Sequence, residues 1–232
     1  MRTILVAILL LTSIPLFATP SGLTWIPNTD TQAKKVWHLD ADTYIYSTNP
    51  TGATANAPFV EEGVLYGVSS RVEAGIDYAA GFVNAPGARV SPLLLNAKYQ
   101  FVTPSTKYPV AFAVGAYNVS PLKAANAQLL YVNGSYSFNK SLSRVTFGGY
   151  TGRKSVIGSD NSGYLLGVED NIRKWWLTAD YQSGENLYGA WNGGVGYNLT
   201  PKLLVFAGYD HYNSPTTVGA KSSVNVQVDI NL

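Results

Sequence analysis

The chain of 232 residues carries 16 lysines and arginines against 14 aspartates and glutamates, a formal net charge of +2, and it has no cysteine. With so small a charge and no basic run, the sequence predicts no nucleic-acid partner, and without cysteine it can form no disulfide. Only 13% of the residues are charged, beside 22 glycines and 16 tyrosines, whereas globular chains have roughly 25% charged residues. This composition is typical of a protein with lipid on one side.

Residues 1–18 are predicted to be a cleaved signal peptide for export. Arg2 is followed by an apolar run over residues 4–17, and a small residue follows at Ala18. This run is shorter than the ~20 residues that a membrane-spanning helix needs. We therefore interpret it as a signal peptide rather than as a membrane anchor.

Residues 19–34 show no periodicity, and we expect them to form a periplasmic N-terminal lead to a single domain over residues 35–232. Within that domain, apolar and polar residues alternate in short runs that turn residues separate. Because side chains on a strand point to opposite faces with period two, each run predicts a strand with one apolar face. The predicted strands are residues 35–47, 59–68, 71–82, 93–102, 110–117, 127–138, 143–151, 164–169, 175–182, 188–198, 203–212 and 222–232.

The last of these runs alternates throughout its length. Its two faces are Val224, Val226, Val228, Ile230 and Leu232, and Ser223, Asn225, Gln227, Asp229 and Asn231. In a soluble sandwich the aliphatic face would meet the core, whereas in a membrane barrel it meets lipid and the polar face meets the lumen. Pairing of this strand with the first one, near residues 36–46, would remove the open edges of the sheet.

Two further patterns favour the membrane barrel over the sandwich. Alternate connections are short, at residues 69–70, 104–107, 139–140, 170–173 and 200–201, whereas the other set is longer on average. Outward-facing aromatic residues also gather near strand ends, as in interface girdles: Tyr78, Phe82, Tyr99, Phe101, Tyr136, Phe138, Trp175, Tyr181, Tyr197 and Tyr209. We therefore predict an all-β fold, a single antiparallel up-and-down transmembrane β-barrel of about 12 strands with short periplasmic turns and longer extracellular loops.

Two stretches resemble bacterial outer-membrane β-barrel proteins. Residues 222–232 resemble their C-terminal signal strand, although this chain ends in Leu232 where that strand usually ends in Phe or Trp. Residues 66–78, Tyr-Gly-Val-Ser-Ser-Arg-Val-Glu-Ala-Gly-Ile-Asp-Tyr, look like a strand–turn–strand hairpin of small channel-like and porin-like barrels. The resemblance implies a place in the cell outer membrane, contact with its lipids, and recognition of the C-terminal strand by the barrel-assembly machinery.

Charged residues on the predicted inward faces form two walls of the lumen. The acidic wall comes from the last strand and the first three, which closure makes neighbours: Asp40, Asp42, Glu61, Glu73, Asp77 and Asp229. The basic wall comes from strands further round: Lys98 and Arg144. Opposed charges across a narrow lumen orient polar solutes, and a surplus of carboxylates favours cations. Charges that pair with one another would instead plug the lumen.

Candidate catalytic chemistry rests on two histidines. His38 lies on the first predicted strand and His211 at the far end of the eleventh, so they cannot share one site, and no metal-ligand spacing or cofactor motif is present. We expect a narrow channel for small polar solutes or cations and no enzyme. The alternatives are a closed structural or surface-interaction barrel and an outer-membrane hydrolase built on one of the histidines.

Overall fold

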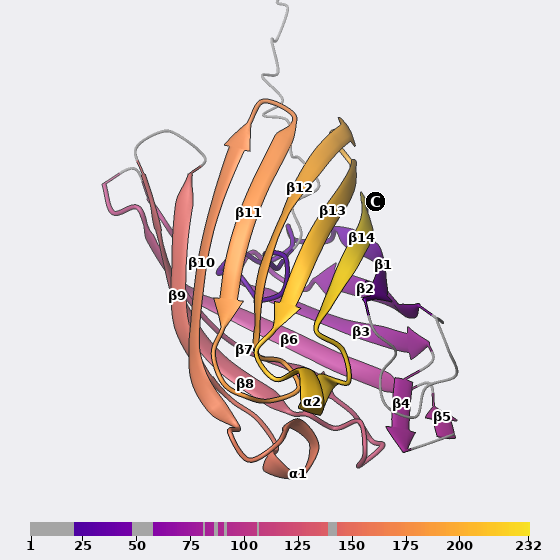
Figure 1. Cartoon of the computed structure of the whole chain (residues 1–232). Helices are drawn as coiled ribbons and strands as arrows, with labels where there is room; N and C mark the ends of the chain where they lie inside the picture. The colour runs from indigo at the N-terminus through magenta and orange to yellow at the C-terminus, as the bar shows by residue number, and fades with distance from the viewer. Residues whose placement is uncertain are drawn as a thin grey trace, which may run out of the picture.

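The computed structural model describes residues 21–47, 58–80, 82–85, 88–90, 92–105, 107–138 and 143–232. The predicted signal peptide lies outside the described residues. Within them, twelve antiparallel strands close into one barrel in the order β1-β14-β13-β12-β11-β10-β9-β8-β7-β6-β3-β2 (Figure 1). The predicted up-and-down barrel and its strand number are confirmed.

The barrel strands are separated by short and long connections in turn. Their bounds are β1 Trp37–Tyr46, β2 Phe59–Gly67, β3 Val72–Ala80, β6 Leu93–Val102, β7 Val110–Val119, β8 Leu129–Ser137, β9 Arg144–Thr151, β10 Ser162–Ile172, β11 Trp175–Gln182, β12 Ala190–Thr200, β13 Leu203–Tyr212 and β14 Ser222–Asn231. We call the end with the β2–β3, β10–β11 and β12–β13 turns the turn end and the opposite end the loop end. At the loop end lie the short helices α1 Lys154–Ile157 and α2 Pro215–Val218.

Closure joins the two strands that are furthest apart in the sequence. β1 pairs with β14 antiparallel, from His38 opposite Asn231 to Tyr46 opposite Ser223. Every backbone donor and acceptor in a lipid-facing sheet needs a partner, and a closed ladder provides one without an edge. The predicted pairing of the last strand with the first is confirmed.

The alternation of side chains sets the two faces of the wall. In β14, Val226 is 39% exposed on the outside, whereas Asn225 is fully buried on the inside. Aromatic pairs flank this outer apolar belt: Trp37 with Tyr66 at the turn end, and Tyr181 with Trp191 at the loop end. None of the helices in the described part of the chain is long and apolar enough to cross a membrane.

Most predicted strands differ from the observed ones by one or two residues at an end, and two of the differences have a clear cause. The third, predicted over residues 71–82, ends at Ala80; Phe82 begins β4 (Phe82–Ala85), which pairs with β5 (Ala88–Val90) in a separate two-stranded sheet. The strand predicted over residues 164–169 extends to Ile172, because its last residues pair with β11 and the turn falls at Arg173, whose φ is 58°. Pairing across the hairpin therefore overrides the turn preference of Asp and Asn.

Candidate functional site: the barrel lumen

Residues 21–33, which precede β1, lie inside the barrel, and we call them the luminal segment (Figure 1). Its side chains at Leu23, Ile26 and Thr29 are buried. The sequence predicts a periplasmic lead over residues 19–34, and the structure places residues 21–33 of that range in the lumen. The segment is irregular and bonds to side chains of the wall, so it leaves no periodic pattern in the sequence.

Two cations of the wall hold the luminal segment in place. The Lys98 ammonium donates hydrogen bonds to the carbonyl oxygens of Ser21, at 2.5 Å, and of Asp30, at 2.7 Å. The Arg144 guanidinium bonds the Asp30 carboxylate at 2.6 Å and also pairs with Glu169 of β10. These charge-assisted bonds come from strands β6 and β9 and tie the segment to that part of the barrel.

Neutral and acidic groups of the wall complete this attachment. The Trp25 amide donates to the Asp180 carboxylate of β11 at 2.9 Å, and the Asn133 side chain of β8 donates to the carbonyl of Pro27 at 2.7 Å. Buried backbone groups must find such partners when they are not in a ladder. Side chains of β6, β8, β9 and β11 therefore replace the strand pairing that the luminal segment lacks.

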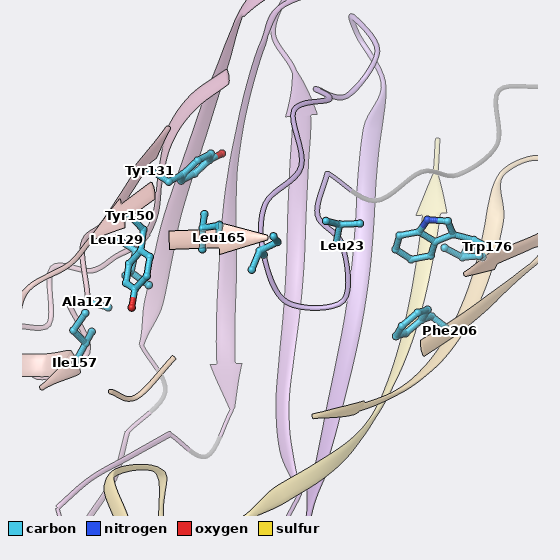
Figure 2. Close-up of a cluster of buried hydrophobic side chains, with 11 residues drawn as sticks. Leu23, Ala127, Leu129, Tyr131, Tyr150, Ile157, Leu165, Trp176 and Phe206 are labelled. Carbon is cyan, nitrogen blue, oxygen red and sulfur yellow. The ribbon is translucent and has the colours of Figure 1, made fainter. Parts of the chain in front are cut away.

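The luminal segment fills one side of the lumen with an apolar cluster. Leu23 and Ile26 belong to a connected cluster of buried apolar side chains that also contains residues of the wall and the loop end: Ala127, Leu129, Tyr131, Tyr150, Ile157, Leu165, Trp176, Leu204 and Phe206. Figure 2 shows Leu23 among these side chains. Because apolar side chains exclude water from this side, any aqueous space must lie on the other one.

A cavity of about 390 Å³ lies between the luminal segment and the wall, and most of its wall residues come from β1, β2, β3, β6 and β14. Tyr117 of β7, Tyr131 of β8 and Tyr212 of β13 line it as well, and Leu23 and Ile26 border it from the apolar cluster. The cavity extends from His38 and Glu73, near the turn end, to Tyr46 and Val218, near the loop end. All six residues of the predicted acidic wall line it: Asp40, Asp42, Glu61, Glu73, Asp77 and Asp229. Lys98 lines it too, but Arg144 does not.

The strand register places several of these carboxylates next to one another. Asp40 is opposite Asp229 across the closing pair, and Asp42 is opposite Glu61 across β1 and β2. Gly63 lies between Asp40 and Asp77 in the same row, and its missing side chain leaves the space that the Asp40 carboxylate occupies. Like charges at directly opposed positions destabilise a sheet, so these carboxyl groups repel one another when they are ionised.

The six carboxylates that line the cavity differ in whether they have an ion-pair partner. Glu73 pairs with Lys98 at 3.0 Å, and Asp229 lies 3.2 Å from His38 Nε2. The other four have no ion-pair partner among the described residues: Asp40, Asp42, Glu61 and Asp77. Two of them accept hydrogen bonds, Asp42 from the Tyr44 hydroxyl at 3.4 Å and Asp77 from the Asn96 amide. When these four carboxyl groups are ionised, no lysine, arginine or histidine of the described residues forms an ion pair with them.

The basic wall that the sequence predicts does not face the acidic one across open space. Lys98 bonds the luminal segment and Glu73, and Arg144 is enclosed by Asp30 and Glu169. Both cations act as anchors, because the luminal segment, which the prediction had placed outside the barrel, supplies their partners.

Three inward carboxylates of the strands are not in the predicted walls. Glu169 of β10 pairs with Arg144, Asp180 of β11 accepts from the Trp25 amide, and Asp210 of β13 accepts from Ser223 and Asn225. All three follow the alternation that identified the other inward residues, so the same rule could have found them. Trp25, which also lines the cavity, lies in an aperiodic stretch where the sequence gives no such signal.

The two histidines lie apart, as the sequence predicted. His38, near the turn end, bonds Asn231 at 2.8 Å as well as Asp229, whereas His211 is at the loop end of β13, opposite Trp191. Among the described residues, no group of His, Asp and Glu is placed to hold a metal ion.

A closed antiparallel barrel with an apolar outer belt and a lumen lined partly by polar side chains is a transmembrane β-barrel of the outer-membrane type. No protein-family model matches the sequence, and no curated protein matches it.

Solved structures match the chain in fold. The KdgM porin superposes with a TM-score of 0.59 at 9% identity, over 84% of this chain and 99% of that one. The NanC porin gives 0.56 at 14% identity, over 84% and 100%. Omp33 of Acinetobacter baumannii gives 0.53 at 10% identity, over 87% and 100%. The protein therefore has the fold of the porin-like outer-membrane β-barrels.

Proposed function

We propose that this protein is a narrow channel of the cell outer membrane that passes small polar solutes and prefers cations. The observation that carries the proposal is the row of carboxylates without an ion pair, Asp40, Asp42, Glu61 and Asp77, along one side of the luminal cavity. Rings of carboxylates favour cations in membrane pores. The porin fold and the predicted signal peptide support export to the outer membrane.

The path that we propose runs between the luminal segment and strands β1, β2 and β3. A cation there exchanges part of its hydration for carboxylate oxygens, and the field of the acidic wall raises its local concentration. The apolar cluster on the other side keeps water out, so the cavity alone carries the solute. A barrel of this strand number lies between the filled eight-stranded kind and the open porins, and the luminal segment narrows it further.

The luminal segment also favours a second candidate, a closed barrel with a structural or surface-interaction role. Its bonds to β6, β8, β9 and β11 fix it across much of the lumen. In such a barrel the cavity would be a dead end rather than a path.

Recording from single proteins in a planar bilayer decides between the two candidates. The channel proposal predicts steady, stepwise currents in KCl after insertion of the folded protein. Silence across salts and voltages, with folded barrels in the membrane, would contradict it and favour the closed barrel. We assign no catalytic role, and the absence of lipid or peptide hydrolysis by the same preparation is expected.

A further inference from the structure

The loop end of the cavity is lined by aromatic rings that surround one residue of the luminal segment. The ring centroid of Trp25 lies 5.8 Å from that of Tyr44, 6.1 Å from Tyr212 and 6.3 Å from Tyr188. All four residues line the cavity. Four aromatic residues, which come from β1, β13, the loop between β11 and β12, and the luminal segment, thus lie close together inside the barrel.

This aromatic cluster is continuous with the acidic wall. Tyr44 and Asp42 are two residues apart on the inward face of β1, and the Tyr44 hydroxyl donates to the Asp42 carboxylate. Asp42 is in turn opposite Glu61. The cavity therefore presents two adjacent carboxylates on one side and the faces or edges of aromatic rings on the next.

One carboxylate oxygen of the acidic wall is buried without a hydrogen-bond partner. Asp229 is 2% exposed and lines the cavity, and its Oδ2 has no hydrogen-bond partner among the described residues, although its Oδ1 lies next to His38. A buried carboxylate oxygen without a partner is costly. A polar solute with a hydroxyl or N–H group could donate the missing hydrogen bond, so this oxygen marks the wall as suited to a polar occupant.

We propose that the cavity binds a small organic cation that carries an ammonium group. The ammonium lies between Asp42 and Glu61, and its alkyl substituents contact the rings of Trp25, Tyr44 and Tyr188. Cations over aromatic faces are attracted by the ring quadrupole, and rings with carboxylates form the cages that recognise quaternary ammonium groups. A cavity of about 390 Å³ is within the range of pockets for small molecules.

Two other occupants fit the cavity less well. A bare metal ion needs several ligands at short range, and no described group of carboxylates and histidines provides them. A neutral sugar could stack on the rings, but it would leave the charges of Asp42 and Glu61 without a counterion.

The organic-cation site rests on the proposed function, because it lies in the cavity of the proposed channel. Binding at this site can nevertheless be measured without recording ion currents. Isothermal titration calorimetry of the folded protein in neutral detergent at low salt should detect saturable binding of choline chloride. Glucose and sodium chloride at the same concentrations should give no saturable heat. Binding of glucose as tight as that of choline, or no binding of choline, would overturn the proposal.

Matched variants locate the site. Glu61→Gln should weaken choline binding by about tenfold, which corresponds to about 1.4 kcal/mol, whereas Glu62→Gln, on the outward face of the same strand, should leave it unchanged. Tyr188→Leu should weaken it to a similar extent, and Tyr188→Phe, which keeps the ring, should not. Equal affinities of the Glu61→Gln and Glu62→Gln proteins would refute the site. If Glu61→Gln does not fold, the Tyr188 pair decides.

The outcomes separate this inference from the channel proposal. Choline binding without any bilayer current would contradict the channel and leave the cation site standing. Ion currents without choline binding would support the channel and contradict the organic-cation site.

Discussion

Val226 and Gln227 are neighbours in β14, but their side chains face lipid and lumen, respectively. A charge on the lipid face of a barrel costs roughly 2–4 kcal/mol near the midplane. We therefore expect Val226→Lys to lower the free energy of unfolding by about this amount. Gln227 is opposite Asp42, so Gln227→Lys should cost much less, because its ammonium can pair with the carboxylates of the cavity.

Urea titration of both variants in lipid vesicles, followed by tryptophan fluorescence, measures this difference. Conservative Val226→Ile and Gln227→Asn variants serve as controls for changes in shape. Equal losses in the two lysine variants would show that the two faces of β14 are assigned wrongly.

For single residues, the sequence predicted which face of the wall a side chain occupies better than it predicted the groups that the side chain contacts. The alternation placed Asn225 on the inward face, and it lies there, but fully buried and bonded to Asp210. Likewise, Lys98 points inward as predicted but binds the luminal segment. Period two determines which face a side chain occupies, whereas its partners depend on segments far away in the sequence.

At the scale of elements, the β1–β14 pair can be tested by cross-linking, since the chain has no native cysteine. Thr43 is directly opposite Val226 in the register, and Val224 is its diagonal neighbour. Directly opposed Cβ atoms are about 4.5–5.5 Å apart and diagonal ones about 7–8 Å. We expect Thr43→Cys with Val226→Cys to form a disulfide under mild oxidation, and Thr43→Cys with Val224→Cys to form far less.

Non-reducing electrophoresis of unfolded protein reports the bond as a shift in mobility. Each single-cysteine variant is the control for links between molecules. A stronger bond in the diagonal pair would mean a different register at closure.

The luminal segment is the element whose removal should change conduction most. Deletion of residues 21–34 leaves all twelve strands in place but removes Leu23 and Ile26 from the apolar cluster. Water should then enter that side of the lumen, so the single-channel conductance should rise and the thermal stability should fall. Substitution of Asp30 by Asn, which weakens one anchor to Arg144, should have a smaller effect in the same direction.

Planar-bilayer recordings of the full-length and shortened proteins give this comparison directly. An unchanged conductance in a folded, shortened barrel would mean that the segment does not limit the path.

For the molecule as a whole, local sequence patterns predicted the barrel, but they did not predict the segment that fills part of its lumen. The alternation of side chains and of short and long connections predicted about twelve strands, because both patterns depend on neighbours in the sequence. The pairing of residues 222–232 with the first strand could be predicted because each edge of the sheet needs a partner. The luminal segment has neither periodicity nor a motif. Its position results from Lys98, Asn133 and Arg144, which lie far along the chain.

That segment makes the lumen asymmetric, and the asymmetry underlies the proposed selectivity. One side is packed with apolar side chains, and the other presents carboxylates to a cavity. The net charge of +2 for the whole chain is a poor guide to conduction, since a permeant ion responds to the wall beside it and outer charges beyond about 10 Å are screened at moderate salt.

The reversal potential across a KCl gradient shows whether cations pass along the acidic wall of the lumen. The unmodified protein should prefer potassium over chloride, and Asp42→Asn combined with Asp77→Asn should shift the potential towards anion preference. The control Glu62→Gln should leave it unchanged, because that side chain faces outward. Chloride preference in the unmodified protein, or the same potential in the double variant, would contradict the account.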